Sequence, residues 1–360
     1  MKQVSVRPKS QRSTGRITLQ DVARAAGVSP STVSRALRGE RAVDPELVER
    51  VMAVSDQLGY VPDPAARALA SQRSNHVTIL IPLLSNTLFV DLLEAAQKTF
   101  RNAGFQTLMG VTHYNPSEEE QLLREQLHHR PAGLLITGLD HSPATQKLMS
   151  RSKVPCVHLM DLPISEQGDQ ISASLMASDS GAGPFCVGFR QTDAGEAMTK
   201  YLLSKGKTRI VFAAAQLDPR VLQRLLGWRK ALKQAGLFNA SLEWLNPAPS
   251  SLVLGGQMFE QIMKQSPDVD AIFFCNDDLA QGALLAAMRM GVSVPSKVAI
   301  AGFNDLTGSD QMWPPLTTVK TPRAQVGESA AQMLLQLIRG EAPEVPQLDL
   351  GFEIMARQSA

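Results

Sequence analysis

From Val77 onward, polar side chains follow several apolar runs, and their types suit recognition of hydroxyl groups and of a negative charge. Amide and carboxyl groups hydrogen-bond to hydroxyls, and an arginine can donate two parallel hydrogen bonds to a carboxylate. The candidate ligand-binding residues are Asn86, Phe89, Asp161, Arg220, Arg224, Asn276 and Asn304. We therefore expect these positions to bind a polar small molecule.

An enzyme site on the same scaffold would need a motif that the sequence lacks. It contains no dinucleotide-binding glycine motif, Walker loop, HExxH helix or serine nucleophile elbow. Asp277 and Asp278 could form an acid/base pair, but adjacent carboxylates more often cap a helix. Three histidines lack metal-ligand spacing and are expected on the surface: His113, His128 and His129. We expect no catalysis, no metal and no cofactor.

Alternating strands and helices must position the candidate residues. The apolar runs predict strands at 77–81, 107–111, 133–137, 156–160, 209–214, 271–275 and 297–302, with a final strand and short tail in 347–360. The amphipathic segments predict helices at 89–103, 116–128, 144–150, 192–205, 221–235, 255–265, 278–290 and 323–339. Such alternation predicts parallel sheets covered on both faces. The number of strands favours two α/β lobes, with a ligand between them at the strand ends.

The N-terminal part of the chain carries most of the positive charge. Residues 1–76 contain 12 basic and 7 acidic residues, whereas the rest contains 24 and 27. A basic head suggests a polyanionic partner, with a solubilising tail as the alternative. Residues 1–16 are basic, but no apolar stretch follows them, so we expect a disordered tail and no secretion signal. We also expect no membrane span, and the three scattered cysteines, Cys156, Cys186 and Cys275, suggest a reducing cytoplasm.

Three short helices are expected in the head, at 19–26, 30–38 and 45–58. Gly27 can end the first helix, Ser29-Pro30 can begin the second, and Asp44-Pro45 the third. Two short helices joined by a glycine-containing turn form a helix-turn-helix unit, whose second helix enters the major groove. There Ser31 can contact a base and Arg35 can bridge O6 and N7 of a guanine. The alternative is a three-helix bundle that binds nothing.

A further short helix is expected at 63–72, after the Asp63-Pro64 pair. Its face is almost entirely alanine, with Leu69 as the one large residue. Such a helix is too short to be stable alone, and an exposed leucine can wedge between base pairs in a minor groove. The alternative is a plain linker.

The head resembles the DNA-binding headpiece of the lactose/galactose-repressor family, in the strings ITLQDVARAAGVSPSTVSRAL and LGYVPDPAARALASQ. The resemblance implies a tail at 1–16, a helix-turn-helix domain at 17–61, a hinge helix and linker at 62–75, and a core at 76–360. It implies that Pro30 and Ser31 read bases and that Leu69 is a minor-groove lever. The predicted DNA-binding residues are Thr18, Leu19, Ser29, Pro30, Ser31, Thr32, Ser34, Arg35, Arg38, Ala66 and Leu69.

The core resembles the same family in FFCNDDLAQGAL and VAIAGFNDLTGSDQMWPPLTTVKTPRAQVG. The implied fold class is a small all-α helix-turn-helix headpiece plus an α/β two-lobed periplasmic-binding-protein-like core. Three chain crossings between lobes are expected, near 162–190, 303–306 and 318–323. Arg224, four residues before Trp228, falls where the family keeps an effector-binding arginine. Asn276 falls at a sugar-contacting asparagine, and Asp161 at an aspartate of the cleft.

Asn304 stands where most members of the family that bind neutral sugars or purines have an aspartate. Losing that carboxylate removes a repulsion against an anionic ligand. Arg220 and Arg224 are expected at the mouth of the cleft, with Arg190 as a third candidate. We therefore predict a sugar-acid effector, as in the gluconate and 2-ketogluconate repressors that the chain resembles most. A neutral effector, or a sugar-binding module without DNA function, is the alternative.

The assembly expected from the resemblance is a cytoplasmic homodimer on a pseudo-palindromic double-stranded operator. Residues 168–185 are rich in Ser, Ala and Gly and are expected to form a surface loop.

Overall fold

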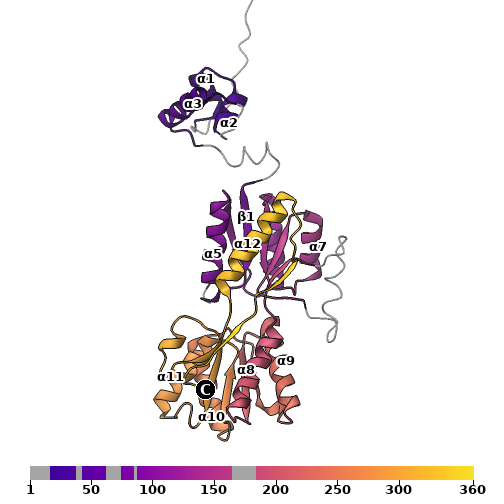
Figure 1. Cartoon of the computed structure of the whole chain (residues 1–360), viewed down its shortest axis with the longest axis vertical. Coiled ribbons are helices and arrows are strands. Elements are labelled where there is room, and N and C mark those ends of the chain that lie inside the picture. Colours follow the sequence, from indigo (N-terminus) through magenta and orange to yellow (C-terminus); the bar gives the residue numbers. More distant parts are fainter. Residues whose placement is uncertain (1–16, 38–42, 62–73, 85–86, 164–183) are drawn as a thin grey trace, which may run out of the picture. The chain divides into compact units, whose positions relative to one another are not determined.

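The computed structural model describes residues 17–37, 43–61, 74–84, 87–163 and 184–360 (Figure 1). The chain divides into two compact units, Met1–Ser74 and Asn75–Ala360. The predictions for the basic tail, the hinge helix, Arg38, Ala66, Leu69, Asn86 and residues 168–183 of the segment 168–185 lie outside the described residues. No helix in the described ranges is both long and apolar enough to cross a membrane.

The first unit is the predicted three-helix headpiece, with α1 at Leu19–Ala26, α2 at Pro30–Leu37 and α3 at Pro45–Leu58. Val22, Val33 and Val51, one from each helix, are fully buried at its centre. Local signals fix the helix ends. Thr18 and Asp21 form a capping box at the start of α1, and Gly27 ends it with a φ of 68°. The predicted boundaries of α1 and α3 and the start of α2 are confirmed, while the predicted end of α2 at Arg38 lies outside the described residues.

The first lobe of the second unit is a six-stranded parallel sheet in the order β11-β5-β4-β3-β1-β2. Its strands are β1 His76–Ile81, β2 Gln106–Val111, β3 Gly133–Thr137, β4 Cys156–Leu159, β5 Cys186–Gly188 and β11 Gln347–Asp349. Four helices cover it: α5 Leu88–Asn102, α6 Pro116–His128, α7 Pro143–Ser152 and α12 Arg323–Arg339. α6 packs with α7 and α5 with α12.

The second lobe contains the sheet β12-β10-β9-β8-β6-β7, in which only the pair of β10 and β12 is antiparallel. Its strands are β6 Ile210–Ala215, β7 Glu243–Asn246, β8 Ala271–Phe274, β9 Ala299–Asn304, β10 Thr317–Lys320 and β12 Glu353–Met355. The lobe also contains α8 Gln191–Ser204, α9 Pro219–Gln234, α10 Leu252–Gln265, α11 Asp277–Met290 and the 3-10 turns Ala240–Leu242 and Ser309–Gln311. A Cβ on Gly227 would lie 2.1 Å from the carbonyl oxygen of Thr192, so α8 and α9 pack with almost no space between their backbones.

The chain passes between the sheets after β5, between β10 and α12, and between β11 and β12. The predicted crossing near 303–306 is wrong, because β9 and β10 pair with each other in the second sheet. The third crossing lies instead at 350–352. The prediction of one final strand is also wrong, since β11 joins the first sheet and β12 the second. Each is only three residues long, too short for a periodic pattern to reveal.

Candidate functional site

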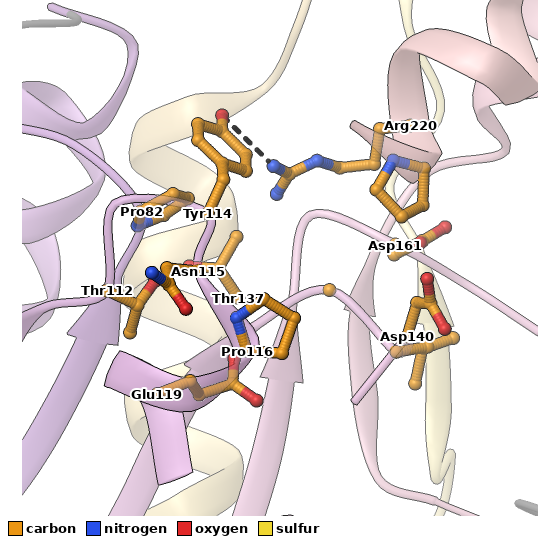
Figure 2. A pocket seen from close by; sticks show the side chains of 13 residues that line it. Pro82, Thr112, Tyr114, Asn115, Pro116, Glu119, Thr137, Asp140, Asp161 and Arg220 are labelled. Atoms are coloured by element: carbon orange, nitrogen blue, oxygen red, sulfur yellow. Dashed lines mark hydrogen bonds between the residues drawn. The ribbon is translucent and has the colours of Figure 1, made fainter. Parts of the chain in front are cut away.

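A cavity of about 130 Å³ lies between the two lobes of the second unit (Figure 2). The first lobe contributes residues that follow β1, β2, β3 and β4, and the second lobe contributes the first turn of α9. Figure 2 shows polar side chains from both lobes on its wall, among them Tyr114, Asp161 and Arg220. The wall therefore forms at the carboxyl ends of parallel strands, where open α/β sheets bind ligands.

Arg220 is held in place at the start of α9. Asp218 caps the helix, and its Oδ1 accepts hydrogen bonds from the backbone N–H and from Nε of Arg220, both at 3.1 Å. Nη2 of Arg220 donates to the hydroxyl of Tyr114 at 3.2 Å, whereas Nη1 is buried without a partner among the described residues. Burial disfavours the charged guanidinium, but Asp218, Tyr114 and Asp161 together outweigh this effect, and the pKa of Arg220 rises above its usual value.

Asp161 lies on the cavity wall just after β4. Its Oδ1 accepts from the backbone N–H of Leu162 at 2.9 Å, and its Oδ2 accepts from Nε2 of Gln223 at 3.3 Å. Burial raises the pKa of this carboxyl group to about 6. The Asp161 carboxyl group therefore changes its protonation state at a higher pH than an exposed aspartate does.

Arg224 follows Arg220 by one turn of α9 and is 3% exposed. Its Nε donates to Oε1 of Gln191 at 2.9 Å, and its Nη1 donates to the carbonyl oxygen of Cys275 at 2.6 Å and to Oδ1 of Asn276 at 3.1 Å. Within the described part of the chain, no carboxylate forms an ion pair with it. Burial lowers the pKa of Arg224 to about 10, as expected for a cation removed from water.

Asn276 and Asn304 lie close to Arg224 and form a polar cluster with it, at the carboxyl ends of β8 and β9. Nδ2 of Asn304 donates to Oδ1 of Asn276 at 3.2 Å, while Oδ1 of Asn304 is buried and has no partner in the described ranges. An unpaired buried acceptor is costly unless a ligand satisfies it. Asn304 has a φ of 107°, in the left-handed region that is rare for non-glycine residues.

The adjacent carboxylates Asp277 and Asp278 lie in the first turn of α11, directly after its N-cap residue Asn276. Asp277 accepts from Thr318 at 2.6 Å, from the backbone N–H of Leu306 at 2.7 Å and from Ser309 at 3.0 Å. These bonds tie the loop after β9 to the start of α11. Asp278 accepts from the N–H of Leu279 at 3.0 Å in the first turn of that helix. Burial raises the pKa of Asp277 to about 6.

The structure thus divides the predicted binding residues. Asp161 and Arg220 lie on the cavity wall. The other three residues, Arg224, Asn276 and Asn304, form a buried polar cluster, in which Arg224 comes from the same helix, α9, as Arg220. Phe89 is 1% exposed in the core of the first lobe and is not among the residues that line this cavity. Arg190 is also not among them. It is exposed and pairs with Asp349 at 3.5 Å.

Sequence reasoning missed Tyr114, Glu119 and Asp140, which also line the cavity. Tyr114 follows β2 and Asp140 follows β3. The strand-end rule that selected Asp161 and Asn304 would have found both, had it been applied to every strand. His113, His128 and His129 are exposed, as expected.

In the headpiece, the predicted DNA-contacting residues cluster at the start of α2. Ser29, Pro30, Ser31 and Arg35 are exposed, and Thr32 and Ser34 are half-buried. The hydroxyl of Ser29 accepts from the N–H of Thr32 at 3.1 Å and so caps the helix. Thr18 is exposed and Leu19 half-buried at the start of α1. Val33 and Ala36 face the core, which leaves a polar outer face of the kind that reads a major groove.

Comparison with known proteins matches both units. The family described as "Bacterial regulatory proteins, lacI family" matches residues 18–63, and the "Periplasmic binding protein-like domain" matches residues 199–360. The chain is 48% identical to the HTH-type transcriptional regulator GntR of Pseudomonas aeruginosa, over 98% of each chain. It is 34% identical to GntR of Escherichia coli, over 94% of this chain and 97% of that one. The crystal structure of transcription regulator GntR from Chromobacterium violaceum aligns with a TM-score of 0.73 and 47% identity, over 79% of this chain and 98% of that one.

Proposed function

Since the chain belongs to the lacI family of bacterial regulatory proteins, we propose that it is a repressor controlled by a sugar acid that binds between the two lobes of its core. Its membership makes it a DNA-binding transcriptional repressor and not an enzyme. We propose further that it acts as a homodimer in the cytoplasm.

The observation that carries the sugar-acid proposal is the burial of two arginines, of which one, Arg224, forms no ion pair with a carboxylate of the described residues. Arg220 and Arg224 are both less than 10% exposed, and in the described ranges only Asp218 forms an ion pair with either of them. A buried cation without a counter-ion is unfavourable, so the site gains most from an anionic ligand. A carboxylate also matches the two-pronged geometry of a guanidinium.

The hydroxyl groups of a sugar acid find acceptors in the same region. Asp161 offers carboxylate oxygens on the cavity wall, and Oδ1 of Asn304 is a buried acceptor in the neighbouring cluster. The volume of about 130 Å³ is several times what one water molecule needs, so it suits a small polar ligand. We assign effector contacts to Asp161, Arg220, Arg224, Asn276 and Asn304.

A neutral sugar is the second candidate effector. The observation in its favour is that Glu119, Asp140 and Asp161 all line the cavity. Paired hydroxyl groups bind well to carboxylate oxygens, which repel an anion. Oε1 of Glu119 already lies 2.9 Å from Nδ1 of the buried His141. This contact reduces the repulsion between Glu119 and an acidic ligand.

For DNA recognition we propose that the exposed start of α2 enters the major groove, with Ser31 and Arg35 on base edges. In a homodimer, two headpieces would read the two halves of a pseudo-palindromic operator. The effector acts only through its different affinity for two arrangements of the lobes. A coupling of about 1–3 kcal/mol is typical of such linkage.

The hinge segment is proposed to carry that signal, with Leu69 wedged in the minor groove. Leu69→Ala should then weaken operator binding and leave effector binding intact. Fluorescence anisotropy with operator DNA, together with calorimetry for the effector, measures both. Unchanged operator affinity would exclude the lever role.

A thermal-shift screen of the full chain tests the effector. The panel contains gluconate, 2-ketogluconate, 6-phosphogluconate, glucose, galactose, ribose and purines. A ligand at 100 times its Kd stabilises the folded state by about 2.7 kcal/mol. A shift with hexonates alone supports the proposal. A shift with a neutral sugar or a purine alone replaces the sugar acid and leaves the repressor assignment in place.

A further inference from the structure

Tyr114 faces Arg220 across the cavity (Figure 2). Tyr114 belongs to the first lobe, in the turn between β2 and α6, and Arg220 belongs to α9 of the second lobe. The hydrogen bond of 3.2 Å from Nη2 of Arg220 to the phenol oxygen therefore connects the two lobes at the site itself. The guanidinium carbon also lies 5.6 Å from the centre of the Tyr114 ring.

The direction of this bond leaves the phenol proton for a ligand. The guanidinium has only donors, so the phenol oxygen must accept and its own O–H must point elsewhere. Among the described residues we find no acceptor for that proton. Burial raises the pKa of Tyr114 to about 12, which keeps the hydroxyl protonated. Nη1 of Arg220 is likewise buried without an acceptor in the described ranges.

The backbone holds Tyr114 in an unfavourable conformation at this place. Its φ is 55° and that of His113 is 50°, in the left-handed region that bulky side chains avoid. The turn is fixed on both sides. The N–H of Asn115 donates to the carbonyl of Thr112 at 2.8 Å, and Oδ1 of Asn115 caps α6 through Ser117 at 2.9 Å. Such local strain is commonly found where a side chain serves a binding site.

We propose that Tyr114 is a specificity-determining residue, which forms with Arg220 a clamp for the carboxylate of the effector, one donor from each lobe. This inference rests on the proposed function, since it needs an acid in the cavity. One carboxylate oxygen would accept from the phenol and the other from Nη1 of Arg220. The carboxylate is then the group that joins the lobes. A neutral analogue of the same shape would turn an amide N–H toward these donors and lose part of the clamp.

The test compares gluconate with its neutral amide, gluconamide, on the full chain by isothermal titration calorimetry. The measured quantity is the ratio of the two affinities, called here the acid preference. Tyr114→Phe removes one charge-assisted hydrogen bond and should lower gluconate affinity by about tenfold or more, with a smaller effect on gluconamide. Tyr114→Gln returns a side-chain N–H donor and should recover part of the acid preference, which a purely structural role would not produce.

Tyr201→Phe is the matched control. The Tyr201 hydroxyl donates to the carbonyl of Ala360 at 3.3 Å and is not among the atoms that line the cavity, so its acid preference should equal that of the wild type. If the wild type prefers gluconate and Tyr114→Phe keeps the full preference, the clamp is overturned and the proposed effector stands. If the wild type binds no sugar acid, the proposed effector fails and the clamp fails with it.

Discussion

The guanidinium carbon of Arg224 lies 3.7 Å from the centre of the Phe303 ring, one residue before Asn304. The face of an aromatic ring attracts a cation, and this contact compensates in part for the missing counter-ion. The buried charge is thus held by a ring, a carbonyl and two amide side chains, Gln191 and Asn276. Under the proposed function, it stays available to an anionic effector because position 304 carries an amide and not a carboxylate.

The variant Asn304→Asp is expected to weaken the binding of an anionic effector. The new carboxylate would lie beside Asn276 and could neutralise Arg224 from within the protein, while it repels an anionic ligand. Gluconate affinity should fall by roughly 10–100-fold, about 1.4–2.8 kcal/mol, measured by calorimetry. The melting temperature should stay the same or rise. Unchanged gluconate affinity would contradict the role assigned to position 304.

Effector binding should depend on pH through Asp161. Burial raises the pKa of this carboxyl group to about 6, and an anion beside it raises the pKa further, so binding takes up a proton. Gluconate affinity should then be highest below pH 6 and fall as the pH rises through that value, by at most about tenfold per pH unit. Titrations between pH 5 and pH 8 measure the slope.

The free energy of unfolding should also decrease with rising pH because of Asp161. Because the folded pKa lies above that of the unfolded chain, the stabilisation by the protonated form is complete at low pH and is lost as the pH rises toward about 6. Asp277 has a raised pKa of about 6 as well and adds to this trend in stability. The variant Asp161→Asn tests the binding prediction. In this variant the gluconate affinity should no longer depend on pH between pH 5 and pH 8, and an unchanged pH dependence would point to another group.

Arg35→Ala tests the reading of DNA bases. Arg35 is exposed on α2, away from the buried Val33 and Ala36, so the headpiece should remain folded. Loss of a bidentate contact to guanine costs about 1–3 kcal/mol, or roughly 5–150-fold in specific affinity. Fluorescence anisotropy with operator and scrambled DNA separates this loss from a general loss of phosphate contacts. An equal fall on both DNAs would make Arg35 a phosphate contact.

The variant Gly227→Ala tests the close packing of α8 against α9, the helix that contains Arg220 and Arg224. A Cβ there would lie 2.1 Å from the carbonyl oxygen of Thr192 and 2.5 Å from the backbone nitrogen of Glu196, so α8 and α9 would have to separate. We expect a loss of about 1–3 kcal/mol in the free energy of unfolding, measured in urea, and weaker effector binding. Gly256→Ala, whose nearest atom lies 3.3 Å from the added Cβ, should cost less. Equal stability of the two variants would show that the helices can yield.

The sequence alone determined the features that local chemistry controls. Cap residues, N1 prolines and left-handed glycines, such as Asp44, Pro45 and Gly27, placed the headpiece helices within a residue of their observed ends. The apolar periodicity of the core predicted the long helices and the central strands. Polar residues after strands, such as Asp161 and Asn304, were found because strand ends can be read along the chain.

The tertiary structure decided what depends on pairing across long separations. β11 and β12 are three residues each, and only their partners in two different sheets define them and the crossing between them. The same holds for the cavity. Tyr114 and Arg220 are 106 residues apart in the chain, and no local pattern shows that they meet. Arg190 illustrates the converse, because a charge expected at the cleft pairs with Asp349, to which only the fold brings it close. Local sequence determines where helices and strands form, but only the packing of the two lobes determines which side chains meet at one site.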